Sequence, residues 1–215
     1  MKRVNVYIDG FNLYHAIDEL KAPHLKWLDL TALSRSLLRK DENLGTVYYF
    51  SAFATWLPAA YARHRVYVAA LKHQGVEAVM GHFKSKPRSC SVCGAKWTAH
   101  EEKETDVHIA VRLVADALRD EFDRAIVISA DSDLAPSIRI AKQYKPSKEI
   151  MVVAPPKRFA SARDLAPRLE LTKGRLEKCL LPTAFFDTQG NLLLDDKGKP
   201  LIERPVTYTP PATTP

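Results

Sequence analysis

Apolar, β-rich runs alternate with helical stretches as far as residue 154, and this alternation constrains the fold more than any other feature. Five runs are predicted to be strands, at residues 4–8, 46–53, 76–80, 125–128 and 149–153. The last two are almost entirely apolar, which is typical of strands buried on both faces of a sheet. Strands separated by helices favour right-handed crossovers and parallel pairing. We therefore expect an α/β fold with an open parallel sheet of about five strands, flanked by helices.

The stretches between these runs have the spacing and the ends of helices. Residues 57–74 begin near Pro58 and stop at Gly75, which is the usual punctuation of a helix. The helix before the fourth strand is predicted from an apolar stripe at helical spacing, made of Val107, Ala110, Val111, Val114 and Leu118.

Two regions break the alternation. Residues 83–103 are polar and basic and contain Cys90 and Cys93, which predicts an inserted CxxC loop. Residues 181–215 hold two turn signals followed by a Pro/Thr-rich end, which predicts a hairpin-like C-terminal extension with a mobile tail. We expect residues 1–180 to form the main domain and to stay folded when the extension is removed.

The composition bounds the class of protein and its partners. Of 215 residues, 46% are hydrophobic and 27% charged, which argues against a disordered or fibrous chain. No apolar run reaches the roughly 18 residues of a membrane span, and the N-terminus lacks the features of a signal peptide. Three cysteines do not suit a secreted disulfide framework, so we expect a cytoplasmic protein without a membrane partner. The net charge of +7 favours a polyanionic partner.

Acidic residues follow two of the predicted strands and open one helix. Asp9 ends the first strand, Asp131 and Asp133 follow the fourth, and Asp106 begins the helix that leads into the fourth. Each of them alone would be read as a helix N-cap. Because ligands of open parallel sheets gather at the carboxyl ends of the strands, we expect the four to share a pocket. Two carboxylates about 4 Å apart repel by about 4 kcal/mol at an effective dielectric of 20, so such a pocket needs a cation or shifted protonation. Ligands that are all oxygen favour Mg²⁺ or Mn²⁺.

Three segments resemble the motifs of NYN-domain proteins, a branch of the PIN-like nuclease superfamily. They are residues 6–14 (VYIDGFNLY), 102–107 (EKETDV) and 128–136 (ISADSDLAP), and the match extends from residue 3 to about 155. Ala130 and Glu104 depart from the pattern. The family often has Gly in place of Ala130 and a small residue in place of Glu104.

The resemblance implies a PIN-like sheet and a metal-dependent ribonuclease that hydrolyses RNA phosphodiester bonds with Mg²⁺ or Mn²⁺. Carried over by position, the catalytic and metal-binding cluster would be Asp9, Asp106, Asp131 and Asp133, with Asn12 supporting it. The alternative is a non-catalytic NYN module that binds RNA or protein. A phosphohydrolase of another α/β family is disfavoured because the chain has neither a DxD nucleophile pair after the first strand nor a Gly-rich phosphate loop.

RNA that approaches an acidic pocket needs a basic rim. The candidate nucleic-acid-binding residues lie in the inserted loop and after the fifth strand, and Trp97 in the loop offers a stacking face. They are Lys84, Lys86, Arg88, Lys103 and Arg158. The equally simple interpretation is a solvated, charged surface.

The spacing of Cys90 and Cys93 is that of a metal-ligand pair, and Gly94 follows as in zinc knuckles. One CxxC supplies two ligands, whereas a closed structural zinc site needs four. His82 and His100 flank the pair and would complete a Cys₂His₂ site. A second cysteine pair from another subunit of a homo-oligomer, a free thiol pair and a disulfide remain the alternatives.

Overall fold

The computed structural model describes residues 1–211, and its centre is one seven-stranded sheet. The strand order is β4-β3-β2-β1-β5-β6-β7, and every neighbouring pair is parallel except β3 and β4. The strands are β1 (Lys2–Asp9), β2 (Glu42–Ala52), β3 (Glu77–Ser89), β4 (Lys96–Lys103), β5 (Arg124–Ile128), β6 (Glu149–Ala154) and β7 (Leu169–Glu170).

The prediction of a mostly parallel α/β sheet is confirmed, but the predicted number of strands was wrong. All five predicted strands are present, and the two extra ones are β4 and β7. β7 has only two residues and pairs with the end of β6, so no apolar pattern marks it. β4 is polar and half-exposed along its length, and its sequence therefore has the character of a loop.

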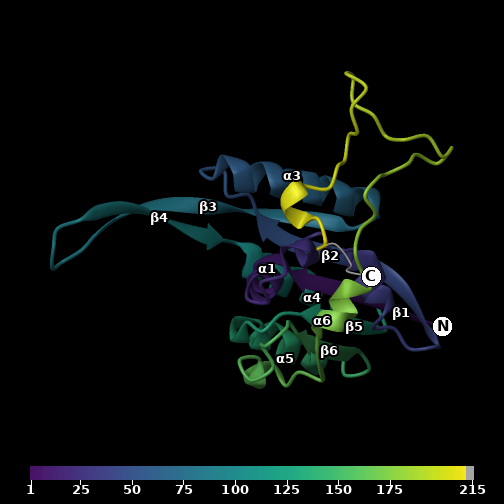
Figure 1. Cartoon of the computed structure of the whole chain (residues 1–215). Coiled ribbons are helices and arrows are strands. Elements are labelled where there is room, and N and C mark those ends of the chain that lie inside the picture. The colour runs from purple at the N-terminus through teal and green to yellow at the C-terminus, as the bar shows by residue number, and fades with distance from the viewer. Residues whose placement is uncertain (212–215) are drawn as a thin grey trace.

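Helices cover both faces of the sheet (Figure 1). One core layer packs α1, α2, α3 and α6 against β1 side chains such as Val6 and Ile8, and the other packs α4 and α5 against Tyr7. This alternation of β1 side chains between two cores is what a central strand requires. The helices are α1 (Gly10–Asp18), α2 (Leu30–Arg35), α3 (Pro58–His73), α4 (Thr105–Leu118), α5 (Ala135–Tyr144) and α6 (Lys173–Glu177). The 3₁₀ turns are η1 (Pro23–Lys26), η2 (Ser132–Leu134), η3 (Arg163–Leu165) and η4 (Val206–Tyr208).

Residues 83–103 are not a loop, because most of them belong to a hairpin that projects beyond the helices (Figure 1). β3 and β4 pair antiparallel from His82 opposite Lys103 to Ser89 opposite Lys96. Backbone hydrogen bonds between the two strands hold the hairpin without a buried face, and so its side chains stay polar. The CxxC pair lies in the turn at its tip.

The C-terminal extension forms two tight turns in place of one hairpin. Single bridges join Phe186 to Leu192 and Leu194 to Pro200, while Asp187 and Asp195 accept backbone N–H bonds inside the turns. The extension contributes Leu181 and Phe185 to the buried core before the turns, and Ile202 and Tyr208 after them. Part of the tail that we expected to be mobile is therefore packed, and residues 212–215 lie outside the described residues.

No helix within residues 1–211 combines the length and the apolar character that crossing a membrane demands.

Candidate active site

Asp9 is the centre of the site because it lies where the strand order reverses, between β1 and β5. It is 4% exposed and caps α1, with Oδ1 accepting the Asn12 backbone N–H at 2.9 Å. Its Oδ2 accepts the Ser129 hydroxyl at 2.8 Å from the end of β5. A Cβ at Gly10 would lie 2.6 Å from the Phe50 carbonyl oxygen, so only glycine lets α1 begin directly after Asp9. Such a reversal of strand order is where open α/β sheets bind ligands.

Hydrogen bonds join the first turn of α1 to the segment after β5. The Asn12 side-chain oxygen accepts the Ala130 N–H at 3.1 Å, and Ser129 Oγ accepts the Asp131 N–H at 3.0 Å. Asp131 in turn caps η2, since its Oδ1 accepts the Asp133 N–H at 2.9 Å. Asn12 and Ser129 thereby link Asp9 to Asp131, and both carboxylates line one pocket.

Asp106 reaches the same cleft from α4, which begins where β4 returns from the hairpin. Glu102 fixes the start of this helix, because its Oε1 accepts the Thr105 N–H at 3.0 Å. The resulting polar pocket has a volume of about 480 Å³. Its lining residues are Asp9, Phe11, Asn12, His15, Glu102, Thr105, Asp106, Ala130, Asp131, Arg158 and Ser161. We call it the carboxylate pocket.

The pocket brings together Asp9, Asp106, Asp131 and Asn12, but the fourth predicted aspartate, Asp133, does not line it. Asp133 is exposed, one turn further along η2. Glu102, which sequence analysis did not predict, lines the pocket, whereas Glu104, which departs from the family pattern, does not. The Glu104 carboxylate instead lies 3.3 Å from His82 Nδ1, outside the pocket. The backbone of Glu104 is left-handed, with φ of 77°, and the spacing of the EKETD motif does not reveal this change of direction.

The environment of this pocket disfavours the charged form of its carboxylates and so raises their pKa values. Burial raises the pKa of Asp9 to about 7, and nearby Asp106 and Asp131 add to the rise, while bonds from Asn12 and Ser129 oppose it. Burial also raises the pKa of Asp106 to about 6, with further contributions from Asp131, Glu102 and Asp133. A bound cation would relieve this repulsion.

The donors present suit a hard divalent ion, although they do not enclose one. Across residues 1–211, no three His, Cys, Asp or Glu side chains stand close enough to hold a metal by themselves. Mg²⁺ and Mn²⁺ prefer carboxylate oxygens, and Mg²⁺ usually keeps several waters in its coordination shell. The donor chemistry of Asp9, Asp106 and Asp131 therefore fits a partly hydrated ion.

Comparison with known proteins decides the family. The model of the NYN domain matches residues 3–170, which is most of the chain. The chain belongs to the NYN domain family. NYN domains are PIN-like, nuclease-type modules, and the mostly parallel sheet agrees with that fold.

Two further proteins are similar to this chain. A crystal structure of a protein of unknown function, VPA0982 from Vibrio parahaemolyticus, superposes with a TM-score of 0.51 at 17% identity, covering 79% of this chain and 91% of that one. This likeness concerns the fold alone. The 6-hydroxy-3-succinoylpyridine 3-monooxygenase HspA of Pseudomonas putida is 26% identical over 223 residues, covering 84% of this chain and 70% of that protein.

The predicted basic rim of this NYN domain has two parts. Lys86, Arg88 and Lys103 surround Glu101 on the hairpin, at 2.6, 2.8 and 3.2 Å. These three cations lower the pKa of Glu101 to about 2. Lys84 is exposed nearby, whereas Arg158 lines the carboxylate pocket itself and pairs with Glu19.

The predicted Cys₂His₂ site does not form. Cys90 and Cys93 lie at the hairpin tip, while His100 pairs across the hairpin with Ser85. Ser85 lies five residue steps before Cys90 along the extended chain, a distance of about 17 Å. His100 stacks on Trp56 with ring centroids 3.7 Å apart, and His82 contacts Glu104. Strand extension therefore separates residues that are close in sequence.

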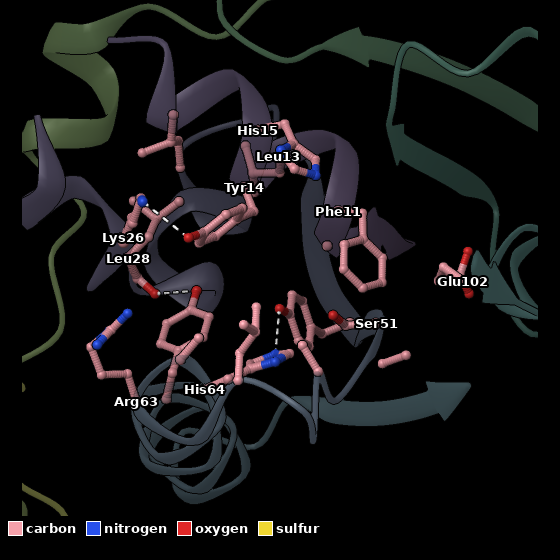
Figure 2. A pocket seen from close by; sticks show the side chains of 18 of the residues that line it. Phe11, Leu13, Tyr14, His15, Lys26, Leu28, Ser51, Arg63, His64 and Glu102 are labelled. Carbon is pink, nitrogen blue, oxygen red and sulfur yellow. Dashed lines mark hydrogen bonds between the residues drawn. The ribbon is translucent and has the colours of Figure 1, made fainter. Parts of the chain in front are cut away.

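A larger, mostly apolar pocket of about 530 Å³ with several aromatic rings in its lining adjoins the carboxylate pocket, and sequence analysis did not predict it. Its walls come from α1, η1, β2, α3 and the hairpin, with Tyr208 from the C-terminal extension (Figure 2). The two pockets share Phe11, His15 and Glu102. No periodic pattern links aromatic residues on so many elements, so only the fold reveals this aromatic pocket.

Proposed function

We propose that this NYN domain is a metal-dependent ribonuclease that hydrolyses RNA phosphodiester bonds. The observation that carries the proposal is the carboxylate pocket, where Asp9, Asp106 and Asp131 converge from three chain segments. The pKa values of Asp9 and Asp106 are raised, as expected where carboxylates gather to hold a cation. Family membership supports the same reaction class, because NYN domains are typically nucleases.

Asp9, Asp106 and Asp131 would hold Mg²⁺ or Mn²⁺, which when bound neutralises phosphate charge and makes water a stronger nucleophile. Asn12 and Ser129 orient the Asp9 carboxylate through the hydrogen bonds already described. Asp106 is half-buried, and it would orient the attacking water and accept its proton. The water oxygen would bond to phosphorus as the bond from phosphorus to the leaving 3′-oxygen breaks.

Arg158 is the cation best placed to receive the scissile phosphate, because it lines the carboxylate pocket. The phosphate would compete with Glu19 for its guanidinium group. Lys84, Lys86, Arg88 and Lys103 would guide the flanking strand along the hairpin. Phosphate contacts of this kind make binding weaken steeply with salt.

The test is Mn²⁺-dependent cleavage of single-stranded RNA by the Asp131→Asn variant. We expect a loss of at least about 100-fold with the fold unchanged by circular dichroism, because removing one charge-stabilising group commonly costs that much. Glu104→Gln is the matched control, since it removes a neighbouring carboxylate outside the pocket and should keep the wild-type rate. Wild-type cleavage by Asp131→Asn would contradict the assignment.

A non-catalytic module that binds RNA is the second candidate. It is favoured by one observation, that no three potential ligands within residues 1–211 form a metal-binding group unaided. RNA binding by the wild-type protein without Mn²⁺-dependent cleavage would support it.

The Pseudomonas relative suggests a third candidate, an enzyme acting on a small heteroaromatic acid. The aromatic pocket favours it, since its size suits a compound of that class. A monooxygenase also needs dioxygen and an electron donor. Loss of 6-hydroxy-3-succinoylpyridine on incubation with the protein, dioxygen and a reduced nicotinamide would support it.

A further inference from the structure

Aromatic rings from several elements line the aromatic pocket, and some of them pack edge to face on one another. Phe11 and Tyr14 come from α1, Tyr49 from β2, His64 and Tyr67 from α3, and Phe83 from the hairpin. Rings of this kind stack on planar ligands and accept any heteroaromatic face. A volume of about 530 Å³ lies within the range of sites for small organic groups.

The polar groups of the pocket are arranged from a cationic end to an anionic end. Figure 2 shows Lys26 and Arg63 on one side and Glu102 on the other, toward the carboxylate pocket. Lys26 Nζ donates to the Tyr14 hydroxyl at 3.1 Å and lies 4.3 Å from the centre of its ring, and it also pairs with Asp18 at 2.5 Å, so an incoming anion would share Lys26 with Asp18. A ligand that fits both ends has a ring in the middle and an anionic group near Lys26 and Arg63.

The centre of the pocket offers neutral hydrogen-bonding groups. His64 Nε2 lies 3.1 Å from the Tyr49 hydroxyl, and burial lowers the pKa of His64 to about 4. His64 is therefore neutral at pH 7 and can pair with the edge of an uncharged ring. Ser51 lines the same region.

The pocket also adjoins the proposed reaction site. Phe11, His15 and Glu102 line both pockets, so a chain could pass from one to the other. In single-stranded RNA each phosphate is followed by a base that is free to unstack and to insert between aromatic side chains.

We propose that the aromatic pocket receives one unstacked nucleobase of single-stranded RNA while a neighbouring phosphate occupies the carboxylate pocket. This inference rests on the proposed ribonuclease function and names its substrate as RNA read at one unpaired base. Lys26 and Arg63 would contact the next phosphate beyond that base. A free heteroaromatic acid shares this chemistry of ring and anion, and the experiment separates the two sources.

The test fills the pocket without removing any polar group. Ala60 on α3 lines the pocket, whereas the adjacent Ala59 is exposed and does not line it. Ala60→Trp should block the base, and Ala59→Trp is the matched control for the cost of a tryptophan on this helix. The probe is a fluorescently labelled RNA decamer, bound in EDTA so that binding is measured without cleavage.

We expect Ala60→Trp to weaken the Kd for the decamer at least about tenfold, within the range that losing one base-stacking contact gives. Ala59→Trp should bind as wild type. Decamers with one abasic nucleotide should bind the wild type more weakly at one register, and Ala60→Trp should lose this discrimination. Asp131→Asn should retain both effects, which separates failure of this proposal from failure of the nuclease assignment.

Unchanged RNA binding by Ala60→Trp would overturn the proposal, even if cleavage is confirmed. The second arm uses nicotinate as a free heteroaromatic acid. Binding of nicotinate that Ala60→Trp abolishes, together with RNA binding that it does not change, would also overturn the nucleobase proposal and assign the pocket to a small molecule.

Discussion

The carboxylate pocket and the tip of the β3–β4 hairpin were both predicted to hold metal ions. The fold brings the predicted ligands together in the first region and separates them in the second. Asp9, Asp106 and Asp131 are far apart in sequence but meet at one edge of the sheet. Cys90, Cys93, His82 and His100 lie in one short segment, yet the extended strands place the histidines well away from the tip. Parallel pairing gathers strand ends, whereas a hairpin spreads its residues along a line.

The two regions also differ in their electrostatics. Burial and mutual repulsion raise the pKa of Asp9 and Asp106. At the hairpin tip, hydrogen bonds from the backbone N–H groups of Cys93 and Val92 lower the pKa of the Cys90 thiol. The tip is open, with Val92 94% exposed. The tip therefore favours the thiolate form of Cys90, but one chain supplies only two cysteine ligands there.

The largest expected difference between the regions is in catalysis. Asp106→Asn should reduce RNA cleavage by at least about 100-fold, since it removes a group that orients the attacking water. Cys90→Ser should keep the rate within about twofold of wild type, because the tip lies far from the pocket. Steady-state cleavage of one RNA substrate by both variants measures the contrast, and equal losses would show that the tip takes part in the reaction.

The second difference is in the dependence of stability on pH. The folded-state pKa of Asp9, about 7, lies above its unfolded value, so the folded state binds more protons between about pH 4 and 7. The free energy of unfolding of the metal-free protein should therefore fall as pH rises through this window, by about 2–4 kcal/mol. Urea unfolding of wild type and Asp9→Asn at pH 5 and pH 8 measures this.

Asp9→Asn should lose the part of this fall that Asp9 supplies and keep the part that the raised pKa of Asp106 supplies, whereas Cys93→Ser should retain the whole fall. Added Mn²⁺ should restore stability to the wild type at pH 8, because a ligand that binds only the folded state stabilises it. A pH dependence that is identical in wild type and Asp9→Asn would show that folding does not raise the pKa of Asp9.

The smallest expected effect is zinc binding at the tip. With two cysteine ligands from one chain, a monomer should retain less than about 0.2 zinc per chain after gel filtration, because structural sites need four ligands. Elemental analysis and light scattering on the same fractions measure both quantities. One zinc per two chains in a dimer, lost in Cys90→Ser, would instead show that two tips share a Cys₄ site.

The sequence alone determined the order of the elements, the buried strands and the family. Apolar β5 and β6 and the motifs around Asp9, Asp106 and Asp131 are local patterns, and local patterns report burial and chain direction. They therefore placed Asp9 and Asp131 at strand ends and made a shared pocket a reasonable expectation.

Only the tertiary structure decided which side chains enter that pocket. It placed Glu102 inside, and Asp133 and Glu104 outside, because a left-handed residue and one turn of η2 redirect the chain. It also formed the polar hairpin and the aromatic pocket, whose parts come from elements with no common pattern. Convergence of side chains depends on strand register and on crossovers between distant segments, which a linear sequence does not display.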